Sequence, residues 1–400
     1  MNVCKESREG FALSTTIVAL VVIGLLVTGG FFAASQEGRI STSSADADVA
    51  LRVAEHGINT AVGTWTVGSL SNVEKHGPTS IALKVGGRTI GTATVEARRL
   101  GDRLYFVTST GRVARGNAER KLGMLVRTIE MEAKTDRAVS TYSPIEVSGS
   151  SVVSGEDKPN PAWPADECPE SQGMKTGIVA RDTSLVTKGS AKAQIIGNPP
   201  KAEDPSITRE NLVNFGEWDL DDLIENADKR VPPGTNNPPV EAKTRSDGTC
   251  DVGERYNWGA PNDPNHPCHD YFPIIYAEGD LDLQSQGRGQ GILIVNGNLG
   301  IRGGFEFSGI IIVRGKIETG GGDSKIYGSV IILGENTSEK SKIKDCDTEG
   351  CTTEMNGNPI IHLSTCAIDR AVKNNPALSR IIPIAERSWV DLTASGVGVN

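Results

Sequence analysis

The sequence predicts an α+β protein. A long N-terminal helix, half of it transmembrane, should precede an antiparallel sheet and then a β-solenoid-like domain of parallel strands. Three observations support this: an uncharged run of 24 residues, short alternating segments after it, and a glycine that recurs every 18 residues. The expected divisions are a leader at 1–10, the helix at 11–65, the sheet at 66–140, the solenoid-like domain at 141–345 with a proline-rich and helical insert at 157–273, and a cysteine-containing segment at 346–400.

The uncharged run extends from Phe11 to Ala34. As a helix that rises about 1.5 Å per residue, it would reach about 36 Å, which exceeds the ~30 Å hydrocarbon core of a bilayer. The helical pattern continues to Trp65, because small and apolar residues recur there at helical spacing. These residues are Ala45, Val49, Leu51, Ala54, Ile58 and Ala61. We therefore expect one helix with its first half in a membrane and its second half outside it.

A polar leader of ten residues, Met1 to Gly10, precedes the helix. This order of charged leader, Gly10, Phe11 and uncharged helix resembles the start of type IV prepilins and secretion-system pseudopilins. The sequences Gly10 to Leu13 and Ala54 to Ile58 are most similar to those of PilX-type pilus assembly proteins, which are minor, pilin-like subunits. The resemblance implies that a prepilin peptidase cuts between Gly10 and Phe11 and methylates the new amine of Phe11.

Thr15 occupies the fifth mature position, where the resemblance implies a glutamate in major pilins. A carboxylate inside a bilayer is costly and persists only when it is paired. In that family the implied partner is the N-terminal amine of a neighbour. Threonine cannot form this ion pair, so Thr15 favours a minor or tip subunit over a bulk filament subunit. Gly24, Gly29 and Gly30 would permit close helix contact or local unwinding among pilin helices.

The resemblance also implies a location and partners. We expect the chain to cross the inner membrane once, with its N-terminus in the cytoplasm and an extracytoplasmic head at the tip or surface of a pilus. The implied partners are other pilins, the pilus assembly machinery and the prepilin peptidase. A secretory signal cut near Ala33-Ala34-Ser35 and an uncleaved membrane anchor remain alternatives. A signal usually has a shorter core and a clearly basic leader, whereas here Glu6 and Glu9 offset Lys5 and Arg8.

The charge and the cysteines limit the possible partners and cofactors. A net charge of −9 and a pI of about 5.3 provide no global basic field for nucleic acid. If Cys4 leaves with the leader, an even number of cysteines remains, which in an exported chain favours disulfides of open pairing. No Cys-x2-Cys pair occurs and the histidines are scattered, so we expect no metal and no cofactor. The disulfide candidates are Cys168, Cys250, Cys268, Cys346, Cys351 and Cys366.

The region from residue 66 to 140 should form the antiparallel, pilin-like sheet. Val95 to Arg98 and Leu104 to Thr108 are separated by the turn signal Leu100-Gly101-Asp102. A second turn is expected at Gly86-Gly87. Residues 118–132 fit either a strand or a helix.

Two short helices are expected later in the chain. Asp219 can cap a helix within residues 204–230, because apolar residues follow it at helical spacing. Ser364 can cap another helix that runs to Val372 and stops before Pro376.

An internal repeat occupies residues 274–334. The segments Ile274–Leu283, Ile292–Ile301 and Ile310–Thr319 each contain four apolar residues, a polar residue and a glycine. A fourth, imperfect copy runs from Ser329 to Gly334. The glycines, Gly279, Gly297 and Gly315, would supply a tight corner through unusual backbone angles or close approach. Since one coil cannot bury its own inner face, stacked coils must share a core, which predicts a parallel β-solenoid. An ordinary sheet of hydrophobic strands is the alternative.

No set of residues predicts catalysis. Solenoid folds include polysaccharide-cleaving enzymes, so Asp280, Asp282, Arg302 and Arg314 are the residues that such an enzyme would use. An outward charged row on a strand is usually only solvated, and function must be argued from a site rather than from a fold. The sequence therefore predicts a non-enzymatic minor pilin or pilus assembly subunit. The alternatives are a surface adhesin for a glycan or a protein, and a membrane-tethered polysaccharide-active β-helix enzyme.

Overall fold

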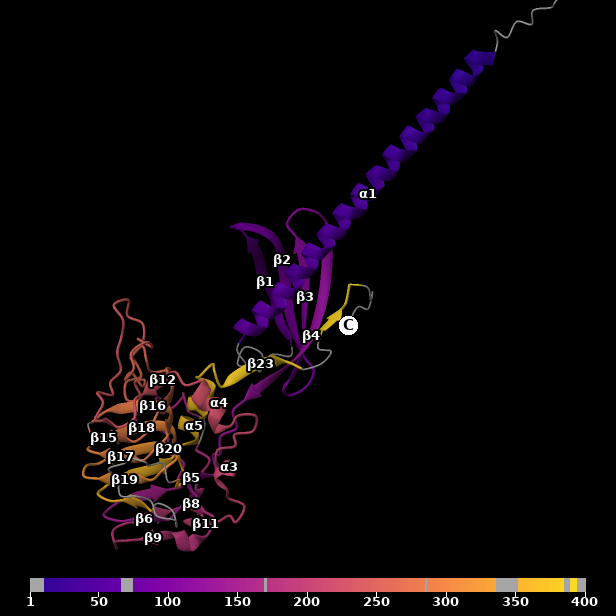
Figure 1. The fold of residues 1–400 in the computed structure, drawn as a ribbon. Helices are drawn as coiled ribbons and strands as arrows, with labels where there is room; N and C mark the ends of the chain where they lie inside the picture. Colours follow the sequence, from indigo (N-terminus) through magenta and orange to yellow (C-terminus); the bar gives the residue numbers. More distant parts are fainter. Residues whose placement is uncertain are drawn as a thin grey trace, which may run out of the picture. The chain divides into compact units, whose positions relative to one another are not determined.

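A computed structural model describes residues 11–65, 75–168, 171–284, 286–335, 352–384 and 389–393. The chain forms two compact units, which are shown in Figure 1. Unit 1 comprises Met1–Thr128 and Ile381–Asn400, and unit 2 comprises Ile129–Arg380. Unit 2 is therefore inserted into the sequence of unit 1.

Unit 1 begins with the predicted long helix and continues with an antiparallel sheet. Helix α1, Phe11–Thr64, has 54 residues and a length of about 81 Å at 1.5 Å per residue. The strands β1 (Lys75–Val85), β2 (Arg88–Arg99), β3 (Leu104–Val113) and β4 (Glu119–Glu130) pair antiparallel in chain order. The expected antiparallel sheet is thus present.

Two segments from the end of the chain complete this sheet. β23 (Ser379–Pro383) lies next to β4, and β24 (Trp389–Asp391) pairs antiparallel with β4. The stretch 118–132, which fitted a strand or a helix, is mostly strand β4. Its side chains at Leu122, Met124 and Val126 alternate into the core of unit 1. The C-terminal division at 346–400 contributes strands to both units.

Unit 2 consists of two sheets of parallel strands, in which β15, β17, β19, β6 and β9 lie one below another in Figure 1. Every named strand pair in these two sheets is parallel. The strands are β5 (Arg137–Thr141), β6 (Ile145–Val147), β7 (Val152–Ser154), β8 (Thr176–Ala180), β9 (Val186–Lys188), β10 (Gln194–Ile196), β11 (Lys201–Glu203), β12 (Lys229–Val231), β13 (Thr235–Asn236), β14 (Ile274–Ala277), β15 (Leu281–Leu283), β16 (Arg288–Val295), β17 (Leu299–Arg302), β18 (Glu306–Val313), β19 (Ile317–Gly320), β20 (Lys325–Ile332), β21 (Thr353–Met355) and β22 (Ile360–Leu363).

The repeat of 18 residues forms equivalent strands in both sheets. Strands β14, β16 and β18 pair so that Ile274, Ile292 and Ile310 are in register. The same spacing relates β15, β17 and β19 in the other sheet. The corner glycine is required by close approach, because a Cβ at Gly297 would lie 2.5 Å from the amide nitrogen of Asp280. The apolar side chains of the repeat form the core of unit 2.

The strands do not stack in chain order. The seven-stranded sheet has the order β13-β15-β17-β19-β21-β6-β9. Consequently β21, near the end of unit 2, lies beside β6 from its beginning, with Glu354 opposite Glu146. In the other sheet, β20 pairs with both β22 and β5. The first and last strands of unit 2 are therefore neighbours, and both ends of the stack are built from the middle of the sequence.

The stretch 157–273, which the sequence indicates as a proline-rich and helical insert, also contains strands. Its strands β8 to β13 all belong to the two parallel sheets. These strands have two to five residues each, so they are too short to show a periodic pattern among the surrounding prolines. The segment between β13 and β14 carries no named helix or strand and contains one of the disulfides.

The helices of unit 2 are short. Helix α4, Leu220–Glu225, begins at the predicted cap, where Asp219 and Asp222 form a reciprocal capping box. The helix ends well before residue 230. Helix α5, Thr365–Lys373, also begins as predicted, because the Ser364 side chain accepts a hydrogen bond from the Ala367 amide. The remaining turns are α3 (Arg209–Leu212) and the 3-10 turn η1 (Thr183–Leu185).

Candidate functional site: the exposed N-terminal helix

The first half of α1 exposes a continuous apolar surface. The side chains of Leu13 and of residues 15–32 are exposed all round the helix, with exposed fractions of 75% at Leu13 and 79% at Phe31. Soluble monomers rarely expose an apolar area of this size. The surface therefore requires cover, either from lipid or from other apolar helices.

The length and composition of α1 meet the requirements for crossing a membrane. The described span from Thr15 to Thr64 contains an 18-residue window with a mean hydropathy of 2.6 and no buried residue. A core helix of a soluble protein would be mostly buried, so that alternative does not fit. A signal sequence near the N-terminus would meet the same criteria of length and composition.

Small residues interrupt the apolar surface. A Cβ added at Gly24, Gly29 or Gly30 would meet nothing within 4 Å. The Thr28 hydroxyl donates to the Gly24 carbonyl at 2.6 Å, which satisfies the hydroxyl inside an apolar environment. The predicted packing residues Gly24, Gly29, Gly30 and Thr15 thus lie on one exposed helical segment, where a neighbouring helix could approach the backbone closely.

The second half of α1 packs tightly on the sheet of unit 1. Ala50, Val53, Ala54, Ile58 and Ala61 are fully buried. In Figure 1 this half of the helix runs along β2 and β3, and both strands contact it. The two halves of one helix therefore have different surroundings: the first is exposed and the second is fixed to a folded unit.

Two glycines permit this close packing. A Cβ at Gly111 would lie 2.3 Å from the Ala50 carbonyl oxygen and 2.5 Å from the Ala54 amide nitrogen. A Cβ at Gly57 would lie 2.4 Å from the Ala93 Cβ. Contacts this short cannot be relieved without moving the helix away from the sheet. Gly57 lies within the stretch Ala54 to Ile58 that resembles PilX-type proteins, but the sequence did not predict a packing role for either glycine.

The predicted processing residues lie at the edge of the described chain. Phe11 is the first residue of α1, and its side chain is not described. Gly10 and the rest of the leader lie outside the described residues. The predicted cleavage between Gly10 and Phe11 therefore stays a prediction.

Two disulfides are formed among the predicted cysteines. Cys168 is bonded to Cys366, 198 residues later, and Cys250 is bonded to Cys268, 18 residues later. The remaining candidates, Cys346 and Cys351, lie outside the described residues. Among the residues that the structure describes, no group of three or more His, Cys, Asp or Glu side chains is placed to hold a metal ion.

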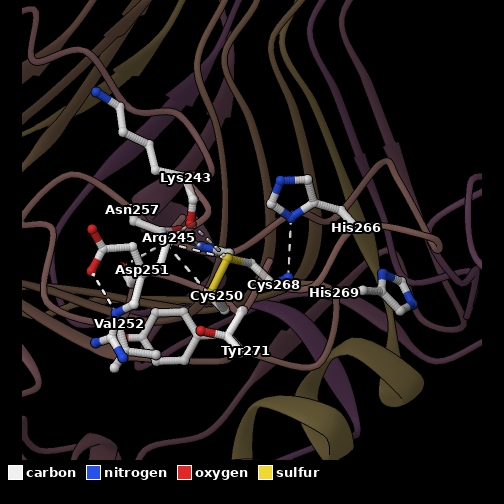
Figure 2. The surroundings of a disulfide bond; sticks show 12 residues. Lys243, Arg245, Cys250, Asp251, Val252, Asn257, His266, Cys268, His269 and Tyr271 are labelled. Atoms are coloured by element: carbon white, nitrogen blue, oxygen red, sulfur yellow. Dashed lines mark hydrogen bonds and ion pairs between the residues drawn. A yellow bond between two sulfur atoms is a disulfide. The ribbon is translucent and has the colours of Figure 1, made fainter. Parts of the chain in front are cut away.

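The Cys250–Cys268 disulfide closes a hydrogen-bonded loop, which Figure 2 shows. The Asn257 amide donates to the Lys243 carbonyl at 3.1 Å and to the Asp251 carbonyl at 2.9 Å. Asn257 is fully buried beside the sulfur atoms. The disulfide and this amide together fix the segment between β13 and β14.

An ionic cluster, in which His269 and Arg370 are buried and Glu167 is partly exposed, lies beside the other disulfide. The Glu167 carboxylate contacts the His269 Nε2 at 2.8 Å and also accepts a hydrogen bond from Arg370 on α5. The Arg370 guanidinium lies 4.4 Å from the ring centroid of Trp163 and 5.1 Å from that of Phe272. Burial opposes ionisation of Glu167, but the hydrogen bond from His269 and the charge of Arg370 outweigh it, so the pKa of Glu167 lies below its ordinary value.

We did not predict this cluster, although its residues lie next to two cysteines in the sequence. Glu167 directly precedes Cys168, and Arg370 lies four residues after Cys366, one turn along α5. Once the disulfide partners are known, Glu167 and Arg370 must be close. The pairing itself could not be deduced from spacing.

The charged residues beside the repeat are engaged between neighbouring strands. The Asp280 carboxylate accepts from the amide nitrogen of Asn298 at 2.7 Å and from its side-chain nitrogen at 3.1 Å. Arg314 donates to Glu335 at 2.9 Å. Asp282 lies in β15 over Gly300, and Arg302 is exposed at the end of β17. Asp280 and Arg314 thus have hydrogen-bond partners on neighbouring segments of the stack.

No protein-family profile matches the chain, and no curated protein matches it. Among solved structures, the chain is similar to the competence-associated pilin ComZ from Thermus thermophilus, at 13% sequence identity and a TM-score of 0.27. The match covers 87% of this chain and 98% of that chain. A TM-score this low carries no argument, so the interpretation depends on the residues of this chain.

Proposed function

We propose that the chain is a pilin-like membrane subunit, in which α1 anchors and assembles the protein and unit 2 is displayed outside the membrane. The observation that carries this proposal is the change of surroundings along α1. Its first half is apolar and exposed, whereas its second half is packed on an antiparallel sheet. A helix that served only as a signal sequence would not need to continue without a break into a folded unit.

The finer assignment is a minor pilin or assembly subunit of the PilX type. Prepilin peptidase would cut between Gly10 and Phe11 and methylate Phe11, with the N-terminus in the cytoplasm and the head outside the inner membrane. Thr15 supports a minor position, because it cannot pair with a neighbour's amine. Gly24, Gly29 and Gly30 would lie at contacts with other pilin helices, since no atom of the described residues lies within 4 Å of a Cβ added at any of them.

Unit 2 would be the displayed head. We propose that its parallel sheets form a β-solenoid, which the in-register strands at 18-residue spacing support. Two disulfides stabilise this unit, as expected for an exported domain. Its role in this proposal is structural or binding, not catalytic.

The mature N-terminus tests the processing step. The full chain would be expressed in a bacterium with and without an active prepilin peptidase, and its N-terminal peptide would be identified by mass spectrometry. We expect methylated Phe11 only when the peptidase is active. An intact Met1, or a start near Gln36, would rule out processing at Gly10.

Incorporation into filaments tests the assembly role. The double variant Gly29→Leu and Gly30→Leu should reduce the amount of the chain in sheared pili, because large side chains would hold neighbouring helices apart. Gly63→Leu is the matched control. Gly63 also lies on α1 with nothing within 4 Å of an added Cβ, but it lies outside the apolar half. Equal incorporation of all three proteins would contradict assembly through this surface.

A further inference from the structure

A groove lies on the surface of unit 2, away from α1 in the sequence. Its volume is about 670 Å³, within the range of about 300–1,000 Å³ that is typical of ligand sites. One wall is formed by Pro239 to Ala242, the other by Gly259 to Asp263 together with His266, and the floor by Gln286 to Arg288. Both walls belong to the segment between β13 and β14.

The walls are held in place before any ligand arrives. The Cys250–Cys268 disulfide ties the segment to itself, and the Ala260 amide donates to the Cys268 carbonyl at 3.2 Å. The indole nitrogen of Trp163 donates to the Pro261 carbonyl at 2.7 Å. Binding would therefore require little ordering of the protein, which favours affinity.

Both hydrogen-bond donors and hydrogen-bond acceptors line the groove. The backbone amide of Cys268 donates to Nδ1 of His266 at 3.0 Å, so a neutral His266 ring carries its proton on Nε2. Figure 2 shows this ring standing apart from the disulfide. Glu241 and Asp263 supply carboxylate oxygens, and within the described part of the chain neither forms an ion pair. Arg288 supplies donors, with its side chain 56% exposed.

The groove does not fit two common classes of polymer. An extended peptide often binds by adding a strand to a sheet edge. Here the floor leads into β16, which pairs with β18 along its whole length and with β14 from Ile292 onward, and the Gln290 amide before that point already donates to the Trp258 carbonyl at 2.8 Å. Polyanions are disfavoured, because Glu241 and Asp263 face the groove and Arg288 is already near Glu306 at 3.5 Å.

We propose that this groove binds an uncharged oligosaccharide. The carboxylates of Glu241 and Asp263 can each accept from adjacent hydroxyl groups, and Arg288 and Nε2 of His266 can donate to them. Pro239, which is exposed in the wall, offers a small apolar surface to the C–H faces of sugar rings. This site does not depend on the proposed function, because it belongs to unit 2 and needs neither cleavage nor assembly.

The test uses the purified full chain in detergent and calorimetric titration. The probes are maltohexaose, cellohexaose, mannohexaose and chitohexaose in its N-acetylated form, with an oligogalacturonate and a proline-rich decapeptide for comparison. We expect a dissociation constant below about 1 mM for at least one neutral sugar. Glu241→Gln should weaken it about tenfold, since a charged acceptor is lost. Ala242→Trp should abolish binding by filling the groove.

Glu278→Gln is the matched control, because Glu278 is an exposed carboxylate of the same unit outside the groove. It should bind as the unchanged protein does. Hydrogen exchange of unit 2 would show that each variant is folded. The proposal is overturned if no neutral sugar binds, if the peptide or the oligogalacturonate binds instead, or if Glu241→Gln and Ala242→Trp bind normally.

Discussion

Replacement of Arg370 by methionine should destabilise unit 2 strongly. Arg370 joins α5 to two distant loops through Glu167, Trp163 and Phe272, and its side chain is only 10% exposed. Methionine keeps most of the aliphatic stem but removes the charge and every donor. The variant therefore leaves the Glu167 carboxylate with His269 but without its cationic partner.

The expected loss follows from the contacts. The pair with Asp270 contributes about 0.5 kcal/mol, since the Asp270 side chain is 81% exposed. Each ring contact contributes about 1 kcal/mol. The bond to Glu167 contributes about 1–2 kcal/mol, a value reduced from that of a fully buried pair because Glu167 is 31% exposed. We therefore expect a decrease of about 3.5–4.5 kcal/mol in the free energy of opening α5.

Hydrogen exchange of the full chain in detergent, read by mass spectrometry, measures this decrease. The peptide covering α5 reports on unit 2, and the peptide covering β2 and β3 in unit 1 serves as an internal reference. Arg380→Met is the matched control. Its guanidinium also lies over a ring, 4.7 Å from the centroid of Trp218, but the residue is exposed and should cost only about 1 kcal/mol.

Two results would refute this reasoning. If Arg370→Met changed the exchange of α5 by no more than Arg380→Met does, the ionic cluster would contribute little stability. If β2 and β3 changed as much as α5, the substitution would act on the whole chain rather than on the cluster.

Three further predictions concern the other packed sites. Gly111→Val should detach α1 from the sheet at a cost of about 3 kcal/mol or more, whereas Gly63→Val should cost much less; thermal unfolding of unit 1 measures the difference. Glu167 has a lowered pKa, so its ionisation stabilises unit 2 above the ordinary value of 4.5, and this stability is lost as the pH falls through the lower folded pKa. Glu167→Gln should therefore flatten the acid side of the stability profile in urea unfolding, and an unchanged slope would assign the acid sensitivity to other groups. Replacing Cys250 and Cys268 by serine should cost about 3 kcal/mol, as expected for a closed loop of 18 residues, and limited proteolysis of that loop should become faster.

Local patterns in the sequence predicted local structure well. The absence of charge from Phe11 to Ala34 was sufficient to predict the exposed helix, because composition alone determines whether a helix suits a membrane. Asp219 and Ser364 were correctly identified as caps, since a cap depends on its own side chain and the next few amides. The repeated glycine at Gly297 marked a corner between two strands.

Contacts between distant segments could not be predicted. Cys168 and Cys366 are separated by 198 residues, and nothing near either residue identifies the other. Apolar segments at Gly177 to Val186 and Ala193 to Ile196 predict short strands, which are present as β8 and β10, but their neighbours in the two sheets could not be identified from such short segments. The sequence does not distinguish Gly111 from other glycines in strands. A side chain at this position is excluded by contact with α1, which is distant in sequence.

The order of strands in unit 2 has a consequence for the synthesis of the protein. Val139 in β5 pairs with Val330 in β20, so the first strands translated gain a full set of neighbours only when the last repeat has been made. While the later part of unit 2 is still being exported, β5 to β7 would lack the strands that pair with them in the folded protein, so their hydrogen-bonding edges would be exposed. Open edges recruit other strands. If unit 2 is exported as proposed, we expect it to require a chaperone that shields those early strands, and we expect slow translocation of the later repeats to increase aggregation.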